Sequence, residues 1–211
     1  MILTNRKFER EPPGREAKSI YIFCEGAKRE FQYFEYFKEM DSRINVEVHK
    51  LDSNDNNSPL GLLEIAKSCI STTSNEHNPK YTFLENDEVW LVLDIDPDKY
   101  ESRKPQIEQI NLEIVELNNW ILTLSNPCFE VWLYYHLIEE KPDLDKLKIC
   151  STWKQLVNNE VNGGFDSRRH PIFIEKAIQN SKSNFEVDGN CPSWKYSSVH
   201  ACRTNITVNE D

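Results

Sequence analysis

No run of apolar residues in this chain of 211 residues approaches the roughly 20 residues that a helix needs to span a bilayer. The polar first 18 residues lack the apolar stretch of a secretory signal. None of the six cysteines forms a Cys-x-x-Cys pair, so we expect neither a structural zinc site nor a disulfide scaffold. The chain has only six glycines, and 38% of its residues are hydrophobic, which excludes a collagen-like or low-complexity protein. These absences favour a soluble, cytoplasmic, globular protein that does not contact a membrane.

An excess of basic residues is also missing. The chain has 25 Lys and Arg against 35 Asp and Glu, which gives a net charge of −10. Proteins that coat nucleic acid are normally basic, so the charge argues against passive DNA binding. The acids are densest in residues 85–101, where seven of them accompany one Lys. Such a cluster is most often a solvated face, but it can also hold a hard divalent cation, and both interpretations stay open here.

Apolar segments with the spacing of strands alternate with segments that have the spacing of helices. The predicted strands are residues 19–24, 44–48, 89–93 and 120–124. The predicted helices are residues 28–40, a helix that Pro59 begins, a helix that Pro105 begins, and residues 128–138. Such alternation implies an α/β fold of the Rossmann-like kind, a mainly parallel sheet with helices on both faces.

The length fits one domain with a small appendage, at roughly 100–200 residues per domain. We expect residues 1–18 to form a polar N-terminal arm and residues 19–140 to form the α/β core. Residues 141–211 are expected to form a helical extension packed on that core. Its predicted short helices are residues 153–158, 171–181 and 198–206.

Polar residues follow the predicted strands at the edge of the sheet where open parallel sheets bind ligands. The first strand ends at Glu25-Gly26, the third at Asp94-Ile-Asp96, and the fourth is followed by a predicted turn at residues 125–127. Three converging carboxylates repel one another unless a cation joins them, and Mg²⁺ suits oxygen ligands and phosphate. The pattern therefore indicates metal-assisted phosphodiester chemistry. Taken singly, an Asp-x-Asp or a Glu-Gly is also an ordinary loop or turn signal.

Four segments of the chain resemble the RloB-like proteins. The first is residues 22–34, which begin IFCEG, and the second is residues 89–96, VWLVLDID. The third, residues 125–133 with the sequence SNPCFEVWL, is the most distinctive. The fourth is residues 192–200. The resemblance extends over residues 18–204 and so covers most of the chain.

The resemblance implies a Toprim fold, the metal-binding α/β domain of topoisomerases, primases and several nucleases. RloB-like genes lie beside restriction–modification loci and in abortive-infection systems, commonly next to an ATPase gene. The resemblance therefore implies a nuclease that depends on Mg²⁺ or Mn²⁺, acts on DNA or RNA in antiphage defence, and has an AAA-type ATPase partner. A homo-oligomer would fit such a defence complex.

The resemblance also assigns roles residue by residue. Glu25 matches a glutamate that binds metal or moves a proton, and Asp94 and Asp96 match metal-binding aspartates. Glu30 matches a second acidic position of the nuclease branch and is taken as a further metal ligand. Glu130, in the third segment, is assigned to the catalytic group.

Substrate binding is assigned to Lys28 and Arg29, which would grip a phosphate from the first turn of their helix, and to Asn126 in the third segment. The chain also departs from the family pattern. Ala27 and Arg29 stand where the family often has Glu and Thr, and Ile95 stands where it often has Arg. The missing arginine leaves one positive group fewer near the phosphate.

Two other functions compete with the nuclease. The protein could be a non-catalytic or partner-activated defence subunit that binds the ATPase, or it could transfer a phosphoryl or nucleotidyl group on a small nucleotide. Chemistry would be favoured if the carboxylates of Glu25, Asp94 and Asp96 lay within metal-bridging distance of one another. A binding role would be favoured if they were scattered. Among the remaining candidates, His136 is interpreted as a core histidine and Trp132 as a core aromatic residue.

Overall fold

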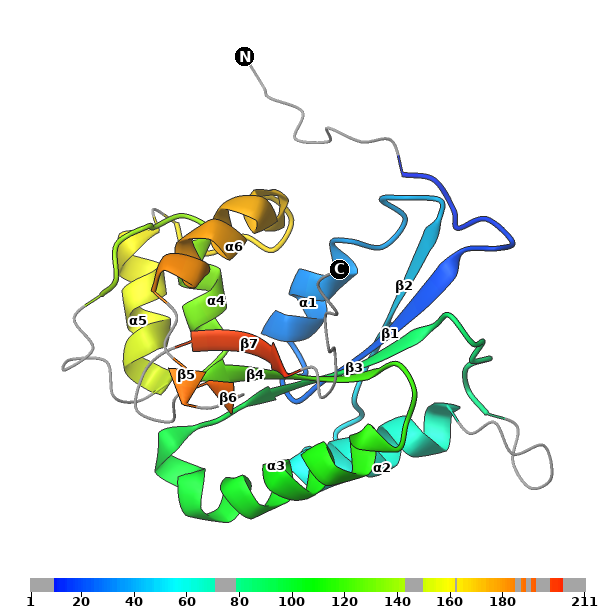
Figure 1. Cartoon of the computed structure of the whole chain (residues 1–211). Helices are drawn as coiled ribbons and strands as arrows, with labels where there is room; N and C mark the ends of the chain where they lie inside the picture. Colours follow the sequence, from blue (N-terminus) through cyan, green and yellow to red (C-terminus); the bar gives the residue numbers. More distant parts are fainter. Residues whose placement is uncertain are drawn as a thin grey trace, which may run out of the picture.

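The protein is built on a five-stranded sheet with the strand order β2-β1-β3-β4-β7 (Figure 1). The computed structural model describes residues 10–70, 79–142, 150–161, 163–184, 187–188, 191–192 and 198–202. The strands of the sheet are β1 (Lys18–Cys24), β2 (Ile44–His49), β3 (Glu88–Asp94), β4 (Trp120–Asn126) and β7 (Ser198–Cys202). The first four pair in parallel, and β7 runs antiparallel to β4. This confirms the predicted α/β, Rossmann-like fold.

Helices cover both faces of the sheet (Figure 1). One face carries α2 (Pro59–Ile70) and α3 (Tyr100–Val115), and α3 follows the short 3₁₀ helix η1 (Pro97–Lys99). The other face carries α1 (Arg29–Glu35), α4 (Glu130–Tyr135), α5 (Cys150–Glu160) and α6 (Ile174–Ser183), the last preceded by η3 (His170–Phe173). A two-stranded ladder joins β5 (Val187–Asp188) and β6 (Cys191–Pro192). The short helices predicted at residues 153–158 and 171–181 are thus confirmed.

The sheet separates two hydrophobic cores. In β3, Val89, Leu91 and Leu93 face the core that α2 and α3 close, whereas Trp90 and Val92 face the core that α1, α4 and α5 close. Because successive side chains of a strand point to opposite faces, a strand buried on both sides must be apolar throughout. This is why the unbroken apolar run predicts a central strand correctly.

The third helix begins earlier than predicted. Pro105 lies inside α3 rather than in its first turn, and the helix begins at Tyr100. A proline in a helix interior removes the hydrogen bond to the carbonyl four residues back, here that of Glu101. The turn before it is nevertheless helical, because the buried side chain of Arg103 binds groups at the ends of β1 and β3. A prediction from the position of the proline alone could not take this contact between distant residues into account.

Two further predictions, the turn at residues 125–127 and the helix at residues 198–206, are wrong. Ser125 and Asn126 do not form a turn but complete β4, and a cis peptide bond joins Asn126 to Pro127. The helix predicted at residues 198–206 is instead a strand over residues 198–202, and residues 203–206 lie outside the described residues. The register pairs β7 with residues 122–126 of β4, whose backbone groups it satisfies. A five-residue segment carries too little periodicity to reveal such a partner.

The helices predicted at residues 28–40 and 128–138 are shorter than expected. Regular α-helix ends at Glu35 and at Tyr135, and turns with hydrogen bonds over three or four residues follow. The described part of the N-terminal arm lies against the turn before β2, where Glu11 N–H donates to the Glu39 carbonyl at 3.0 Å. Residues 1–9 of the arm lie outside the described residues. Within the part of the chain that is described, no helix has the length and apolarity needed to cross a membrane.

A closed hydrogen-bond ring ties α1 to α4. Trp132 Nε1 donates to the Tyr33 hydroxyl at 2.8 Å, and that hydroxyl lies 3.0 Å from His136 Nε2. His136 Nδ1 lies 2.8 Å from the Trp132 carbonyl, which can only accept. Nδ1 therefore carries the proton, and Nε2 accepts from Tyr33. Burial lowers the pKa of His136 to about 4, so the ring holds a neutral imidazole, as expected of a core histidine.

This ring makes folding stability depend on pH. The folded pKa of His136, about 4, lies below the unfolded value of about 6.5, so unfolding takes up a proton between these values. Stability contributed by the neutral imidazole is present above pH ~6.5 and is lost as the pH falls towards ~4, at a cost on the order of 3 kcal/mol. We expect urea unfolding to show a steeper fall for the wild type than for His136→Gln over this range. Parallel pH profiles would contradict the assignment.

Candidate functional site

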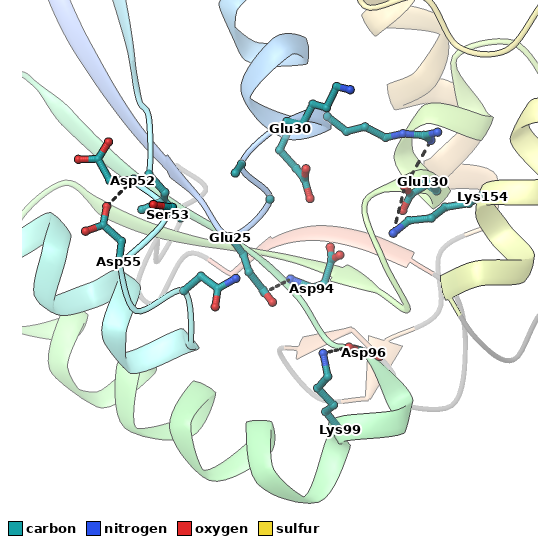
Figure 2. A pocket seen from close by; sticks show the side chains of 16 residues that line it. Glu25, Glu30, Asp52, Ser53, Asp55, Asp94, Asp96, Lys99, Glu130 and Lys154 are labelled. Atoms are coloured by element: carbon teal, nitrogen blue, oxygen red, sulfur yellow. Dashed lines mark hydrogen bonds and ion pairs between the residues drawn. The ribbon is translucent and has the colours of Figure 1, made fainter.

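An open cleft of about 670 Å³ lies at the carboxyl ends of the parallel strands (Figure 2). Its walls come from the segments that follow β1, β2 and β3, and from α1, α4 and α5. The lining residues are Glu25, Gly26, Ala27, Lys28, Arg29, Glu30, Leu51, Asp52, Ser53, Asp55, Asn57, Asp94, Asp96, Lys99, Glu130 and Lys154. The cleft lies at the edge of the sheet that the strand-end residues indicate.

The structure brings the ends of β1 and β3 together through a buried arginine. Arg103 Nη1 donates to Glu25 Oε1 at 2.8 Å, and Nη2 binds the other carboxylate oxygen. Arg103 Nε also donates to the Asp94 carbonyl at 3.0 Å, and the Asp94 N–H lies 3.4 Å from Glu25 Oε2. The guanidinium side chain is 6% exposed. Glu25 is therefore held in one orientation by a bidentate, charge-assisted pair.

Asp96 lies two residues beyond β3, in an unusual backbone conformation. Its φ of 50° is in the left-handed region, which Asp tolerates better than most residues. Its N–H donates to the Pro127 carbonyl at 2.9 Å, which ties the end of β3 to the segment after β4. Its carboxylate lies 3.0 Å from Lys99 Nζ, and this contact raises the pKa of Lys99.

Glu30 reaches from α1 into the cleft (Figure 2). Its carboxylate occupies the space beside Gly26, where a Cβ atom would overlap it, so a larger residue at this position would displace the Glu30 carboxylate. Burial raises the pKa of Glu30, and the nearby carboxylates of Glu130 and Glu25 raise it further. The cleft thus concentrates negative charge that its own cations only partly offset.

Glu130 lies at the start of α4 and joins two basic side chains that come from other helices. Its Oε1 lies 3.4 Å from Arg29 Nη1 on α1 and 3.9 Å from Lys154 Nζ on α5. The Glu130 side chain is 5% exposed, whereas those of Arg29 and Lys154 are 36% and 55% exposed. Glu130 is thus engaged with cations of the cleft wall, away from Glu25 and Arg103.

The predicted site residues fall into two groups. Those that line the cleft are Glu25, Lys28, Arg29, Glu30, Asp94, Asp96 and Glu130. Asn126 is not among the lining residues described; it is 2% exposed at the end of β4. The sequence analysis missed Arg103 and the lysines Lys99 and Lys154.

The polar loop after β2 also contributes to the cleft, although the sequence analysis gave it no role. Asp52, Ser53, Asp55 and Asn57 line the cleft, and the Asp52 N–H donates to Asp55 Oδ2 at 2.7 Å. The loop could have been found with the argument already used for the other strands. It follows the carboxyl end of a parallel strand that neighbours β1 in the sheet.

The donor set of the cleft fits a hard divalent cation but does not enclose one. The acids of Glu25, Glu30, Asp94 and Asp96 offer only carboxylate oxygens, which Mg²⁺ and Mn²⁺ prefer. Among the residues that the structure describes, no three His, Cys, Asp or Glu side chains are grouped so that they could hold a metal ion. Mg²⁺ usually takes one or two carboxylates and completes its coordination with water and substrate phosphate, so two of these acids suffice.

The fold and the cleft together define an α/β protein with a Rossmann-like sheet and an acidic site at its carboxyl edge. Comparison with known protein families matches the RloB-like proteins over residues 20–206. The match covers most of the chain, so the protein belongs to the RloB-like family. Searches of curated proteins and of solved structures found no match.

Proposed function

We propose that the protein is a nuclease of the Toprim type that depends on Mg²⁺ or Mn²⁺ and acts in antiphage defence. The observation that carries the proposal is the convergence in one open cleft of Glu25, Asp94 and Asp96 from the ends of β1 and β3 with Glu30 from α1. Basic side chains line the same cleft. Metal-assisted phosphodiester hydrolysis requires carboxylates that can bind a metal ion and basic side chains that can bind phosphate.

One or two of the acids Asp94, Asp96 and Glu30 would hold the cation, and water and substrate phosphate would complete its coordination. A bound divalent cation polarises the phosphate and lowers the pKa of a water molecule. The chain itself supplies the orientation of these groups. Arg103 fixes Glu25 and the end of β3 in one geometry, and Lys28 and Arg29 line the cleft where they would bind a phosphate.

A cleavage panel tests the proposal. The purified protein is incubated with plasmid DNA, single-stranded DNA and total RNA, each with Mg²⁺, Mn²⁺ or EDTA. We expect cleavage of at least one substrate with metal and none with EDTA, and the cleaved substrate distinguishes a DNase from an RNase. Cleavage that persists in EDTA would contradict the metal-dependent chemistry.

A second function, a non-catalytic or partner-activated subunit that binds an AAA-type ATPase, is favoured by one observation. Both oxygens of Glu25 are occupied by Arg103, and the described acids form no three-ligand group. Such a site would need a rearrangement to become active, which a partner could supply. Cleavage that appears only when a candidate ATPase partner is added would favour a partner-activated enzyme. The absence of cleavage both with and without that partner would favour a binding subunit.

A further inference from the structure

Cationic side chains stand on two sides of the acidic part of the cleft. Lys99 accompanies Asp96 after β3, whereas Arg29 and Lys154 accompany Glu130 at the wall that α1, α4 and α5 form. In Figure 2, Asp94 is seen between Lys99 and Lys154. All these groups line the same cleft. A ligand that contacts both cationic positions must therefore carry at least two negatively charged groups, one on each side of the acids.

Arg29 and Lys154 contact Glu130 at distances long enough to leave both side chains able to bind an anion. Both contacts use the same oxygen of Glu130, at 3.4 Å and 3.9 Å, and the Glu30 carboxylate is close enough to interact electrostatically with Lys154. The contact with Glu130 is the one hydrogen bond of the Arg29 guanidinium within the described residues. A guanidinium has five N–H donors in a fork that suits phosphate oxygens.

Glu130 is suited to position these cations rather than to react. Its side chain is 5% exposed, and it contacts basic side chains of both α1 and α5. It therefore holds Arg29 and Lys154 at the wall in the absence of substrate. This differs from the catalytic role that the resemblance assigns to it.

We propose that the cleft binds a stretch of polynucleotide backbone, with one flanking phosphate at Arg29 and Lys154 and another at Lys99. The phosphate to be cleaved then lies over the acids between them. This rests on the proposed nuclease function and extends it to the form of the substrate, a strand rather than a mononucleotide. Basic side chains that contact the backbone phosphates are the usual way to bind a single strand. Here they flank a cleft in which acidic residues outnumber basic ones, so binding should depend strongly on each of them.

The experiment measures binding apart from cleavage. Fluorescein-labelled single strands of DNA and of RNA, about ten nucleotides long to exceed one cleft, are titrated with Asp94→Asn protein in Mg²⁺, and anisotropy is read over a series of salt concentrations. Arg29→Gln, Lys154→Gln and Glu130→Gln are added singly to this background. Gel analysis of each sample verifies that the strands stay intact.

The control is Lys104→Gln. Lys104 lies 3.9 Å from Glu108 in an exposed ion pair, the same separation as in the Lys154–Glu130 pair, but it does not line the cleft among the residues described. The control therefore removes an equivalent positive charge from the surface. Circular dichroism of each variant verifies that the fold is kept.

We expect Arg29→Gln and Lys154→Gln each to weaken binding about five- to tenfold, irrespective of sequence. The slope of log affinity against log salt should fall by about 0.7 for each cation removed. Glu130→Gln should change affinity in the opposite direction, because the amide keeps an oxygen that can accept from Arg29 but removes the negative charge that competes with the phosphate. A purely structural role for the three residues would not produce opposite signs or a change in salt slope.

Unchanged affinity and salt slope in both Arg29→Gln and Lys154→Gln would overturn the proposal, even where the wild type cleaves with metal as expected. So would equal losses in Lys104→Gln, or the absence of strand binding to the Asp94→Asn protein at low salt. A nucleoside triphosphate that binds as tightly as the strands, with the same dependence on Arg29 and Lys154, would show a mononucleotide site instead. Failure of the nuclease function itself is seen separately, as no metal-dependent cleavage by the wild type.

Discussion

Replacement of Asp94 by Asn is expected to lower metal-dependent cleavage on the order of a thousandfold while the protein stays folded. Asp94 ends β3 and lines the cleft, and its backbone is fixed by Arg103 and Glu25. The amide keeps the shape of the side chain but removes the charge that a divalent cation needs. The measurement is the initial rate of cleavage of the substrate that the panel identifies.

The matched control for this change is Asp98→Asn. Asp98 lies four residues away on η1, is exposed, and does not line the cleft among the residues described. The Asp98→Asn protein should cleave at the wild-type rate, and both variants should unfold at the same urea concentration as the wild type. Normal cleavage by a folded Asp94→Asn protein would remove Asp94 from the site.

Replacement of Arg103 by Met is expected to cost about 3 kcal/mol of unfolding free energy, because it leaves the Glu25 carboxylate without its partner. The side chains are 6% and 19% exposed, so water compensates only in part. The change also removes the donor to the Asp94 carbonyl. Cleavage should fall too, since the end of β1 and the end of β3 lose their common support. Urea unfolding measures the first effect and the initial rate the second.

A double variant separates the charge from the packing. Adding Glu25→Gln to Arg103→Met removes the unpaired carboxylate, so the pair should be less destabilised than the sum of the single changes. Lys104→Met, on the exposed side of the same helix, should stay within about 0.5 kcal/mol of the wild type. An Arg103→Met protein as stable as that control would show that the buried ion pair does not support the fold.

The sequence predicts the sheet, and the position of three acids at one edge of it, for local reasons. A strand buried on both faces must be apolar, and residues 89–93 of β3 are. Because its carboxyl end and that of β1 lie at the same edge, the position of Glu25, Asp94 and Asp96 in one cleft follows from the order of the elements. The same argument would have included the loop after β2.

The rest of the site depends on contacts between distant parts of the chain. Glu130 meets Arg29 and Lys154 only because α1, α4 and α5 pack on one face of the sheet. No local pattern encodes that arrangement. Likewise, β7 joins the sheet through pairing with β4.

Arg103 did leave a signal that went unused. It precedes Ile107, Ile110 and Ile114 at helical spacing and so continues the buried stripe of α3. A charged residue on a buried face needs a partner of opposite charge. Searching the strand ends for that partner would have indicated Glu25.

The central claim is that the acids of the cleft hold a divalent cation, and Mn²⁺ binding measured by electron paramagnetic resonance tests it most directly. The wild-type protein is titrated beside Asp94→Asn and Asp98→Asn, and the free Mn²⁺ signal gives the affinity. We expect the wild type and Asp98→Asn to bind Mn²⁺ saturably, Mg²⁺ to displace it, and Asp94→Asn to lose this binding. Equal Mn²⁺ affinity in all three proteins, or none in any, would contradict it.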